Sequence, residues 1–493
     1  MPSAGFLIFS GVMPLIKTFL SILIGYVLAR KGLFPPAASK GASQVTMNVS
    51  LPLLIFSNIV PAFTPQNVSA MGPLFLTAFV YQILGFLFGF IIREVFYVPR
   101  NFWQGIIVLC GMSNWGNLPN AVVLTVTQQA PFNPDIDPAL GVSFVSIFIV
   151  AYHLVFWVCG AAHSLSWDYL PGIPQGEAAE QHISWKEKPL GSLFSRFVLG
   201  DKPKTISSTK GADVLEIVIN EKDKDKDIEN MAIDTIRYSE NLNNDLARRT
   251  SHISVVSRHT SLGPRPSTDA TPLSLPSSSL SEHGTSPTNP PETHKSTFLS
   301  PTLYRIFHPL AAIVNPVTVS LIISLPIALI QPLKALFVDV SNIGGPSWKG
   351  PDGRPPLAFV IDTAEFLGTI TVPLALILLG ASFARFTIPR PLSRLPIAAM
   401  VAVALAKMLV MPVIGVLMVM GMVKGGLIDE NAKVEKFVAM FLSGTPAAVN
   451  QLIVASLYSP DGNVDTLAAF LLVQYGFLFF SSSALTAIAL LLS

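Results

Sequence analysis

The sequence contains GNLPNAVV at residues 116–123, inside an apolar run from about 103 to 128. A similar stretch, GTPAAVN, occupies residues 444–450 inside an apolar run from about 434 to 457. Each stretch combines glycine, proline and amide side chains in a segment long enough to cross a membrane. A proline removes one backbone hydrogen bond of a helix and biases the preceding residue away from helical conformation. Both stretches therefore predict a membrane helix that is interrupted near its middle.

A second pair of matching stretches precedes the first pair. LPLLIF lies at residues 51–56 and VPLALI at residues 372–377. The proline of GNLPNAVV follows Pro52 by 67 positions, and the proline of GTPAAVN follows Pro373 by 73. Each half contains five apolar runs, an odd number, so the second half must enter the membrane in the opposite orientation. This is the inverted-repeat pattern of many secondary transporters.

Composition supports membrane insertion, with 51% hydrophobic and 13% charged residues and a mean hydropathy of +0.55. Apolar runs of about 20 to 28 residues match a hydrocarbon core of roughly 30 Å crossed at 1.5 Å per residue. The expected spans are 5–29, 41–61, 72–93, 103–128, 139–162, 304–332, 357–382, 393–420, 434–457 and 464–492. The predicted fold is an all-α polytopic membrane protein. Its ten transmembrane helices form two inverted five-helix repeats, in which the broken helices 4 and 9 cross.

Three regions follow from this pattern: a first membrane repeat at 1–162, a loop at 163–303 and a second membrane repeat at 304–493. Lysine and arginine in the first and seventh inter-helix loops place the long loop in the cytosol and both termini on the other side. The loop includes EKDKDKD at residues 221–227 and a stretch rich in Ser, Thr and Pro, a composition typical of disorder. Arg248-Arg249-Thr250-Ser251 resembles a site for a basophilic kinase, but it also fits a merely solvated basic pair.

The two predicted helix breaks supply the candidate binding residues. The N-terminus of a half-helix carries partial positive charge and suits an anionic group such as a carboxylate. Neutral amides bind an anion without the desolvation cost of a buried full charge. Two ordinary proline kinks are the alternative interpretation. The candidate substrate-binding residues are Asn114, Asn117, Pro119, Asn120, Thr445, Pro446, Asn450 and Gln451.

Ionisable residues inside the spans are the next candidates. Lys407 lies in the middle of the eighth span, where a lysine is costly and a functional role in charge coupling is the default hypothesis. Snorkelling to an interface is the alternative. Lys17 has a weaker claim of the same kind. Asp362 and Glu365, near the start of the seventh span, are candidates to pair with a lysine.

Several classes of function are not indicated. The sequence contains no Walker loop, no HExxH, no GxSxG and no cluster of metal ligands at useful spacing, so we expect no enzymatic activity, cofactor or metal. The net charge of +2 comes with no basic and aromatic patch for nucleic acid. Without a nucleotide site, transport must run on existing gradients.

Motifs across the spans resemble the auxin efflux carrier (PIN) superfamily, and several are closer to its PIN-LIKES branch. They are LPLLIF at 51–56, LPNAVV at 118–123, Asn315-Pro316, PLKALF at 332–337, Asp362-Thr363, Leu367-Gly368, VPL at 372–374, LGA at 379–381 and GTPAAVN at 444–450. The resemblance covers the spans and excludes the long loop. It implies a scaffold of spans 1, 2, 6 and 7, a moving transport domain, and a carboxylate held at the crossing of spans 4 and 9.

On that resemblance Asn117, Pro119, Asn120, Pro446 and Asn450 would hold the substrate, and access would alternate by an elevator movement. The resemblance also implies the endoplasmic reticulum membrane, with the plasma membrane as the alternative. One departure concerns the third span, which lacks the Asp and Lys of PIN carriers, while Lys407 lies in its symmetry mate. Coupling and substrate handling by the rules of PIN carriers are therefore in doubt.

The leading hypothesis is a secondary transporter of a small organic anion, an auxin-like weak acid. Its expected partners are that anion and membrane lipid, with a homodimer and a kinase acting on the loop as further candidates. A sodium-coupled carrier similar to bile-acid symporters would want carboxylates beside the crossing, and the sequence has none there. The alternative from another class is a membrane sensor or scaffold that signals through the cytosolic loop.

Overall fold

The computed structural model describes residues 4–63, 68–191, 315–386, 395–459 and 464–493, and all of them belong to one compact unit. These residues form helices and connecting loops without a strand. The predicted disorder and the kinase site, within residues 192–314, lie outside the described part of the chain.

Six helical segments within the described residues are long and apolar enough to cross a membrane. They are Pro36–Ala62, Ser69–Val95, Asp137–Val158, Ala358–Arg385, Ile397–Lys424 and Asp465–Leu492. They coincide with the second, third, fifth, seventh, eighth and tenth expected spans. This agrees with the prediction of an all-α polytopic membrane protein.

Most of these segments consist of shorter elements. In the first half, the second span joins α2 (Pro36–Val45), a π-helical turn (Thr46–Ser50) and α3 (Leu51–Ala62). The third span is α4 (Val68–Val95), and the fifth is α7 (Asp137–His153) followed by a π-helical turn (Leu154–Val158). In the second half, the seventh span joins α14 (Ala358–Gly368) and α15 (Thr371–Arg385), the eighth joins α16 (Ile397–Leu405), a π-helical turn (Ala406–Val410) and α17 (Met411–Lys424), and the last is α20 (Asp465–Leu492). The apolar helix α1 (Ala4–Arg30) covers the first expected range. The apolar helix α12 (Pro316–Leu329) lies within the sixth expected range, 304–332, of which residues 304–314 lie outside the described part of the chain.

The fourth and ninth expected spans are each divided in two. The fourth consists of α5 (Trp103–Gly111) and α6 (Asn117–Thr127), and the ninth of α18 (Lys433–Leu442) and α19 (Asn450–Tyr458). The first interruption lies before Pro119, and the second contains Pro446. Neither is a simple kink within a continuous helix. Pro119 is the third residue of α6, where the missing N–H costs nothing because the first turn has no acceptor for it.

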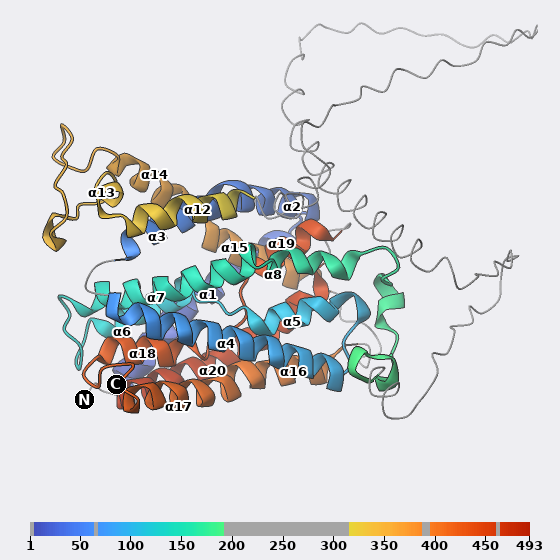
Figure 1. The fold of residues 1–493 in the computed structure, drawn as a ribbon. Coiled ribbons are helices and arrows are strands. Elements are labelled where there is room, and N and C mark those ends of the chain that lie inside the picture. The colour runs from blue at the N-terminus through green and yellow to red at the C-terminus, as the bar shows by residue number, and fades with distance from the viewer. Residues whose placement is uncertain (1–3, 64–67, 192–314, 387–394, 460–463) are drawn as a thin grey trace, which may run out of the picture. The chain divides into compact units, whose positions relative to one another are not determined.

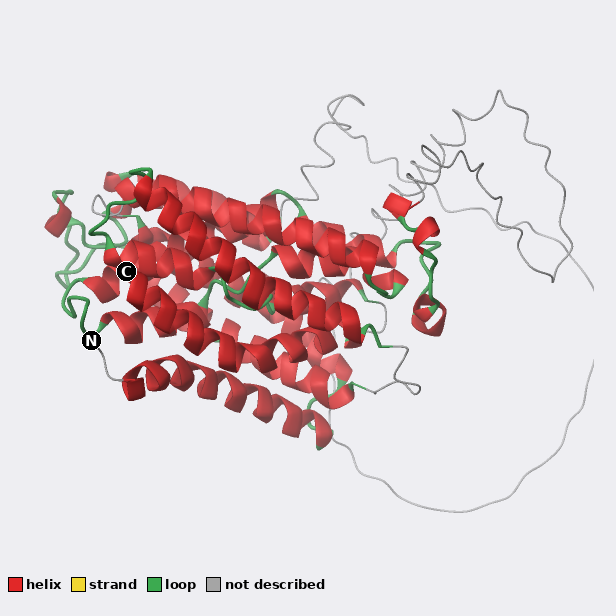
Figure 2. Cartoon of the chain, turned by 90° about the horizontal axis from the view of Figure 1, so that it is seen from below, coloured by secondary structure: helices red, strands yellow, loops and turns green. Residues whose placement is uncertain are grey.

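The helices run side by side, and α3, α12 and α14 form one layer of the bundle (Figure 1). In this layer α3 packs against α12 and α14. Elsewhere α1 packs against α15, α4 against α5, α6 against α7, and α18 and α16 against α20; α1 also contacts α6 and α20. The view from below shows the same near-parallel arrangement (Figure 2). The loop between α13 (Gln331–Lys334) and α14 lies at the end of the bundle that holds the C-terminus, while α8 (Ala161–Ser164) lies towards the other end (Figure 1).

The first part of the expected cytosolic loop, up to residue 191, is folded against the ends of two helices. The carboxylate of Asp168 accepts hydrogen bonds from the backbone N–H groups of Gln104 and Gly105, at 2.9 and 2.7 Å, in the first turn of α5. The Lys188 ammonium donates to the carbonyl oxygens of Arg93 and Glu94 at the end of α4, at 2.7 and 3.1 Å. A negative group at a helix N-terminus and a positive group at a helix C-terminus both interact favourably with the helix dipole. The start of the loop is therefore tied to the broken helix.

We expect this contact to depend on pH. Burial raises the pKa of Asp168 to about 6 from an ordinary value of 3.8, against the opposing effect of its two backbone bonds. Because the folded state holds the proton more tightly, stability falls as pH rises from about 4 to about 6, by on the order of 2 kcal/mol. Asp168→Asn should abolish this dependence in thermal unfolding of the purified protein, while Asp135→Asn, in an exposed loop, should retain it. An unchanged profile in Asp168→Asn would contradict the assignment.

Candidate functional site

The two helix breaks bond directly to each other. The backbone N–H of Asn114 donates to the carbonyl of Pro446 at 2.7 Å, and that of Ala448 donates to Met112 at 3.0 Å. Together they form a short antiparallel bridge between Ser113 and Ala447. Extended backbone inside a membrane has to find partners within the protein. Each break supplies partners for the other.

Side chains from neighbouring helices complete the pairing. The Gln474 side chain of α20 accepts a hydrogen bond from the Ala447 N–H at 2.9 Å. The Trp115 indole N–H donates to the carbonyl of Leu442, at the end of α18, at 3.0 Å. The breaks are thus held in one arrangement by bonds from both sides.

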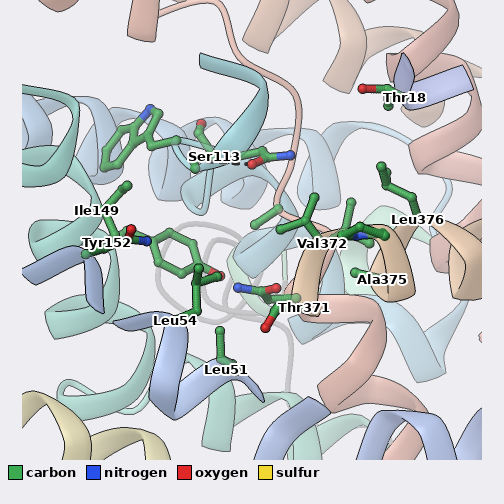
Figure 3. Close-up of a pocket in the computed structure, with 18 of the residues that line it drawn as sticks. Thr18, Leu51, Leu54, Ser113, Ile149, Tyr152, Thr371, Val372, Ala375 and Leu376 are labelled. Atoms are coloured by element: carbon green, nitrogen blue, oxygen red, sulfur yellow. Dashed lines mark hydrogen bonds between the residues drawn. The ribbon is translucent and has the colours of Figure 1, made fainter. Parts of the chain in front are cut away.

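A cavity of about 290 Å³ lies beside the paired breaks. Ser113, Asn114, Gly116, Val449 and Asn450 form one wall of it, and the opposite walls come from α1, α3 and α15. Figure 3 shows Ser113, Tyr152 and Thr371 around this space. Because α6 begins at Asn117 and α19 at Asn450, the N-terminal ends of two half-helices face the cavity region. Their dipoles favour a negative ligand there.

The polar groups of the cavity suit an anion with an apolar body. Lys17 is the only lysine or arginine among the described residues that line it. The Thr371 hydroxyl and the Nδ1 atom of His153 also line it, and both are buried without a hydrogen-bond partner among the described residues. An unpaired buried polar atom costs about 1–3 kcal/mol, which a bound polar ligand or water would recover. Leu51, Leu54, Ile55, Ile149 and Leu376 supply apolar surface.

Lys407 contacts the helix break between α5 and α6. Its ammonium donates to the Cys110 carbonyl, in the last turn of α5, and to the Ser113 hydroxyl, each at 2.8 Å. The side chain is 2% exposed and does not snorkel to an interface. Because the Ser113 oxygen accepts from Lys407, its own hydrogen can be donated elsewhere, and Ser113 lines the cavity.

A neutral counterpart supports the other break. The Tyr81 hydroxyl of α4 donates to the carbonyl of Ala439, in α18, at 3.0 Å and lies in contact with Ser443. Tyr81 thus reaches from the third expected span to the end of α18, as Lys407 reaches from the eighth to the end of α5. Each contacts the serine that follows its half-helix. Of these two contacts, the one at the end of α5 brings a positive charge and the one at the end of α18 does not.

Three of the residues predicted from sequence take part in the cavity or in the pairing of the breaks. Asn114 and Asn450 line the cavity. Asn114 donates to the Tyr475 hydroxyl at 3.4 Å, and Asn450 lies beside the Tyr152 hydroxyl. Pro446 contributes its carbonyl to the pairing of the breaks.

Four other predicted residues lie outside the set that lines the cavity. Pro119 is buried in α6, and the Asn120 side-chain oxygen is buried without a hydrogen-bond partner among the described residues. The Thr445 hydroxyl donates to Leu442 at 3.2 Å. The Gln451 amide donates to the Gly105 carbonyl at 2.8 Å, so it ties α19 to α5. The side chain of Asn117 lies outside the described part of the structure.

Sequence reasoning missed several cavity residues. Tyr475, Tyr152 and Thr371 come from α20, α7 and α15. Lys17 had only a weak claim from its place in the first span. Asp362, a candidate to pair with a lysine, pairs instead with Arg354 at 2.7 Å. That arginine lies in a loop between helices, outside the spans.

An all-helical membrane fold whose two interrupted helices enclose a polar-lined cavity defines a transport protein. The chain belongs to the family of membrane transport proteins that includes the auxin efflux carriers, which it matches over residues 10–486.

Similar proteins include a yeast protein and plant PIN-LIKES proteins. Protein ECM3 of Saccharomyces cerevisiae is 24% identical over 592 aligned positions, covering 95% of each chain. PIN-LIKES 2 of Arabidopsis thaliana is 24% identical over 466 positions, covering 91% of this chain and 87% of the relative. PIN-LIKES 6 of the same plant is 29% identical over 125 positions, 25% of this chain and 29% of the relative. The family recognised from the sequence motifs is thereby confirmed.

Proposed function

We propose that this protein is a secondary transporter of a small amphipathic organic anion, an auxin-like weak acid. The observation that supports this most directly is the pairing of two helix breaks beside a cavity that also contains Lys17. Two helix N-termini, the amides of Asn114 and Asn450, and the Ser113 hydroxyl provide a neutral cradle for a carboxylate. The apolar wall accommodates the rest of the molecule.

The arrangement of the helices supports an inverted repeat of ten spans. Each of the ten expected ranges contains a helix or a divided pair of helices among the described residues, with α12 in the later part of the sixth range. The broken pairs α5–α6 and α18–α19 occupy equivalent positions in the two halves. Tyr81 and Lys407 occupy equivalent positions in turn.

Elevator-type access is the mechanism we propose for this fold. The cavity lies where α1, α3 and α15 meet the paired breaks, α7 and α20. A substrate bound there touches both of the groups of helices that a scaffold and a moving domain would form. Sliding of one group along the other would carry the cavity across the membrane while the bonds between the breaks stay intact. We propose the endoplasmic reticulum membrane as its location, to be tested with a tagged full-length chain and an organelle marker.

Uptake into proteoliposomes tests the site. We expect Asn450→Ala and Asn114→Ala each to lower the initial rate of indole-3-acetate uptake about tenfold, the effect of removing one hydrogen bond to a charged group. Asn431→Ala, an exposed residue of the loop before α18, serves as the matched control and should keep the wild-type rate. Unchanged uptake in both cavity variants would remove this site assignment.

A membrane sensor is the second candidate function. The docking of Asp168 on the first turn of α5 connects the long loop to the broken helix, which a sensor would require. Absence of uptake for the wild-type protein, together with partner proteins that bind residues 163–302 in a cavity-dependent manner, would favour this alternative.

A further inference from the structure

A second cavity, of about 770 Å³, lies between α3, the loop before α14, and α14 and α15. It shares Leu54, Asn58, Val372 and Pro373 with the cavity at the helix breaks. The two spaces therefore adjoin across these residues. The loop between α13 and α14, which contributes to the lining of the second cavity, lies at the end of the bundle that holds the C-terminus (Figure 1). We call the second cavity the vestibule.

Arg354 is the only cation among the described residues that line the vestibule. Its Nη1 and Nη2 atoms donate to Oδ2 and Oδ1 of Asp362, at 2.7 and 2.8 Å. This two-pronged geometry is the one that a guanidinium adopts with any free carboxylate. Asp362 thus occupies the position that the carboxylate of a ligand would take.

The loop that carries Arg354 is held in place by its own bonds. The Gly350 N–H donates to the Arg354 carbonyl at 2.7 Å, and the Arg354 N–H donates to the Asp352 carboxylate at 3.1 Å. Gly353 has a φ of 75°, which glycine adopts without strain. The Leu357 N–H further ties the loop to the Leu336 carbonyl at 2.7 Å. The guanidinium is therefore presented from a defined backbone rather than from a loose tail.

The ion pair is easy to exchange. The Arg354 and Asp362 side chains are 55% and 49% exposed, and an ion pair in such contact with water is weak because solvent screens its charges. An incoming carboxylate can replace Asp362 on Arg354 at little cost, because Asp362 returns to water. Leu54, Phe337 and Ile361 line the same space and can cover the apolar body of the ligand.

We propose that the vestibule is a second binding site, in which Arg354 exchanges Asp362 for the carboxylate of a small organic acid on its way to or from the helix breaks. This proposal rests on the proposed transport function and adds an intermediate station to it. Asp339 and Glu365 also line the vestibule, so once Asp362 is displaced the lining carries three carboxylates and one guanidinium. This net negative charge keeps the binding of a monocarboxylate weak, as an intermediate station requires, and opposes a dicarboxylate more strongly.

Binding to the purified full-length protein in nanodiscs tests the vestibule. Indole-3-acetate is the probe, indole-3-acetamide is the neutral control, and Asn450→Ala serves as the background in which the first cavity is weakened. In that background Arg354→Gln should weaken binding of the acid at least about fivefold, because it loses a charged two-pronged contact. Asp362→Asn should strengthen it about two- to threefold, because it removes the internal competitor. Neither variant should alter binding of the amide.

The opposite directions of the two effects distinguish a binding site from a structural ion pair. If Arg354→Gln and Asp362→Asn shift the affinity in the same direction, or not at all, the vestibule proposal is overturned. Where Arg354→Gln fails to fold, Arg354→Lys keeps the charge, removes the fork and should give a smaller loss. The experiment distinguishes failure of the transport proposal from failure of the vestibule proposal. If the wild-type protein binds the acid through Arg354 but transports nothing, the transport proposal is refuted and the vestibule proposal stands. Wild-type transport kinetics in Arg354→Gln refute the vestibule and keep the carrier.

Discussion

Lys407→Met should lower substrate uptake about 100-fold while the protein still inserts and folds, since it removes two hydrogen bonds from a buried charge and leaves their acceptors unpaired. The ammonium group is the donor that the Cys110 carbonyl and the Ser113 hydroxyl share. Without it the end of α5 loses its compensating charge, and Ser113 loses the bond that orients its own hydrogen. Initial rates in proteoliposomes, normalised to folded protein, measure the effect.

The matched control is Lys424→Met, which lies at the exposed end of the same transmembrane segment and should leave the rate unchanged. A pH series gives the decisive comparison. The initial rate of uptake is measured in a series from about pH 6 to about pH 9. If Lys407→Met matches the wild-type rate throughout this range, Lys407 is only a packing residue and the charge-coupling hypothesis is wrong.

Gly380→Val should prevent folding altogether. A side chain at Gly380 would overlap the backbone carbonyl of Ile22, and one at Gly25 would overlap the backbone of Ile377. The backbones of α1 and α15 are thus in direct contact, as small residues allow in membrane proteins. Since backbone atoms cannot give way as a flexible side chain can, we expect a loss on the order of 4 kcal/mol or more.

Size-exclusion chromatography of a fluorescently tagged protein reports this loss as disappearance of the monodisperse peak. Gly421→Val is the matched control, because a side chain at Gly421 in α17 meets no atom within 4 Å. A normal peak for Gly380→Val would show that α1 and α15 can separate, and that their close packing is not needed for the fold.

Part of this structure could be predicted from the sequence because proline, glycine and asparagine are visible signals inside apolar runs. The interruptions of the spans at 103–128 and 434–457 were found on that basis. The exact ends of these interruptions could not be predicted from the prolines. A proline is well tolerated in the first turn of a helix, so it can lie in the helix that follows an interruption rather than in the interruption itself. Pro119 takes that place in α6.

The site was less accessible to sequence reasoning. Asn450 and Gln451 are neighbours in the first turn of α19, and the sequence does not show where that helix begins. It therefore does not indicate which of the two side chains faces the cavity. Asn450 lines the cavity, while Gln451 bonds to α5. Lys17 and Tyr475 reach the cavity from helices at opposite ends of the chain. Only the packing of those helices brings them together, and packing leaves no local signal.

The bonds between the interruptions also have a consequence for biosynthesis. The Asn114 N–H and the Met112 carbonyl find their partners in Pro446 and Ala448, which leave the ribosome more than 300 residues later. At roughly 5–20 residues per second this takes on the order of half a minute. During that interval the nascent N-terminal half holds unpaired polar backbone in the bilayer, where each such group costs several kcal/mol. These two bonds can therefore form only after the second half has been made, and until then the early chain has to satisfy the groups in another way, through local backbone bonds or water.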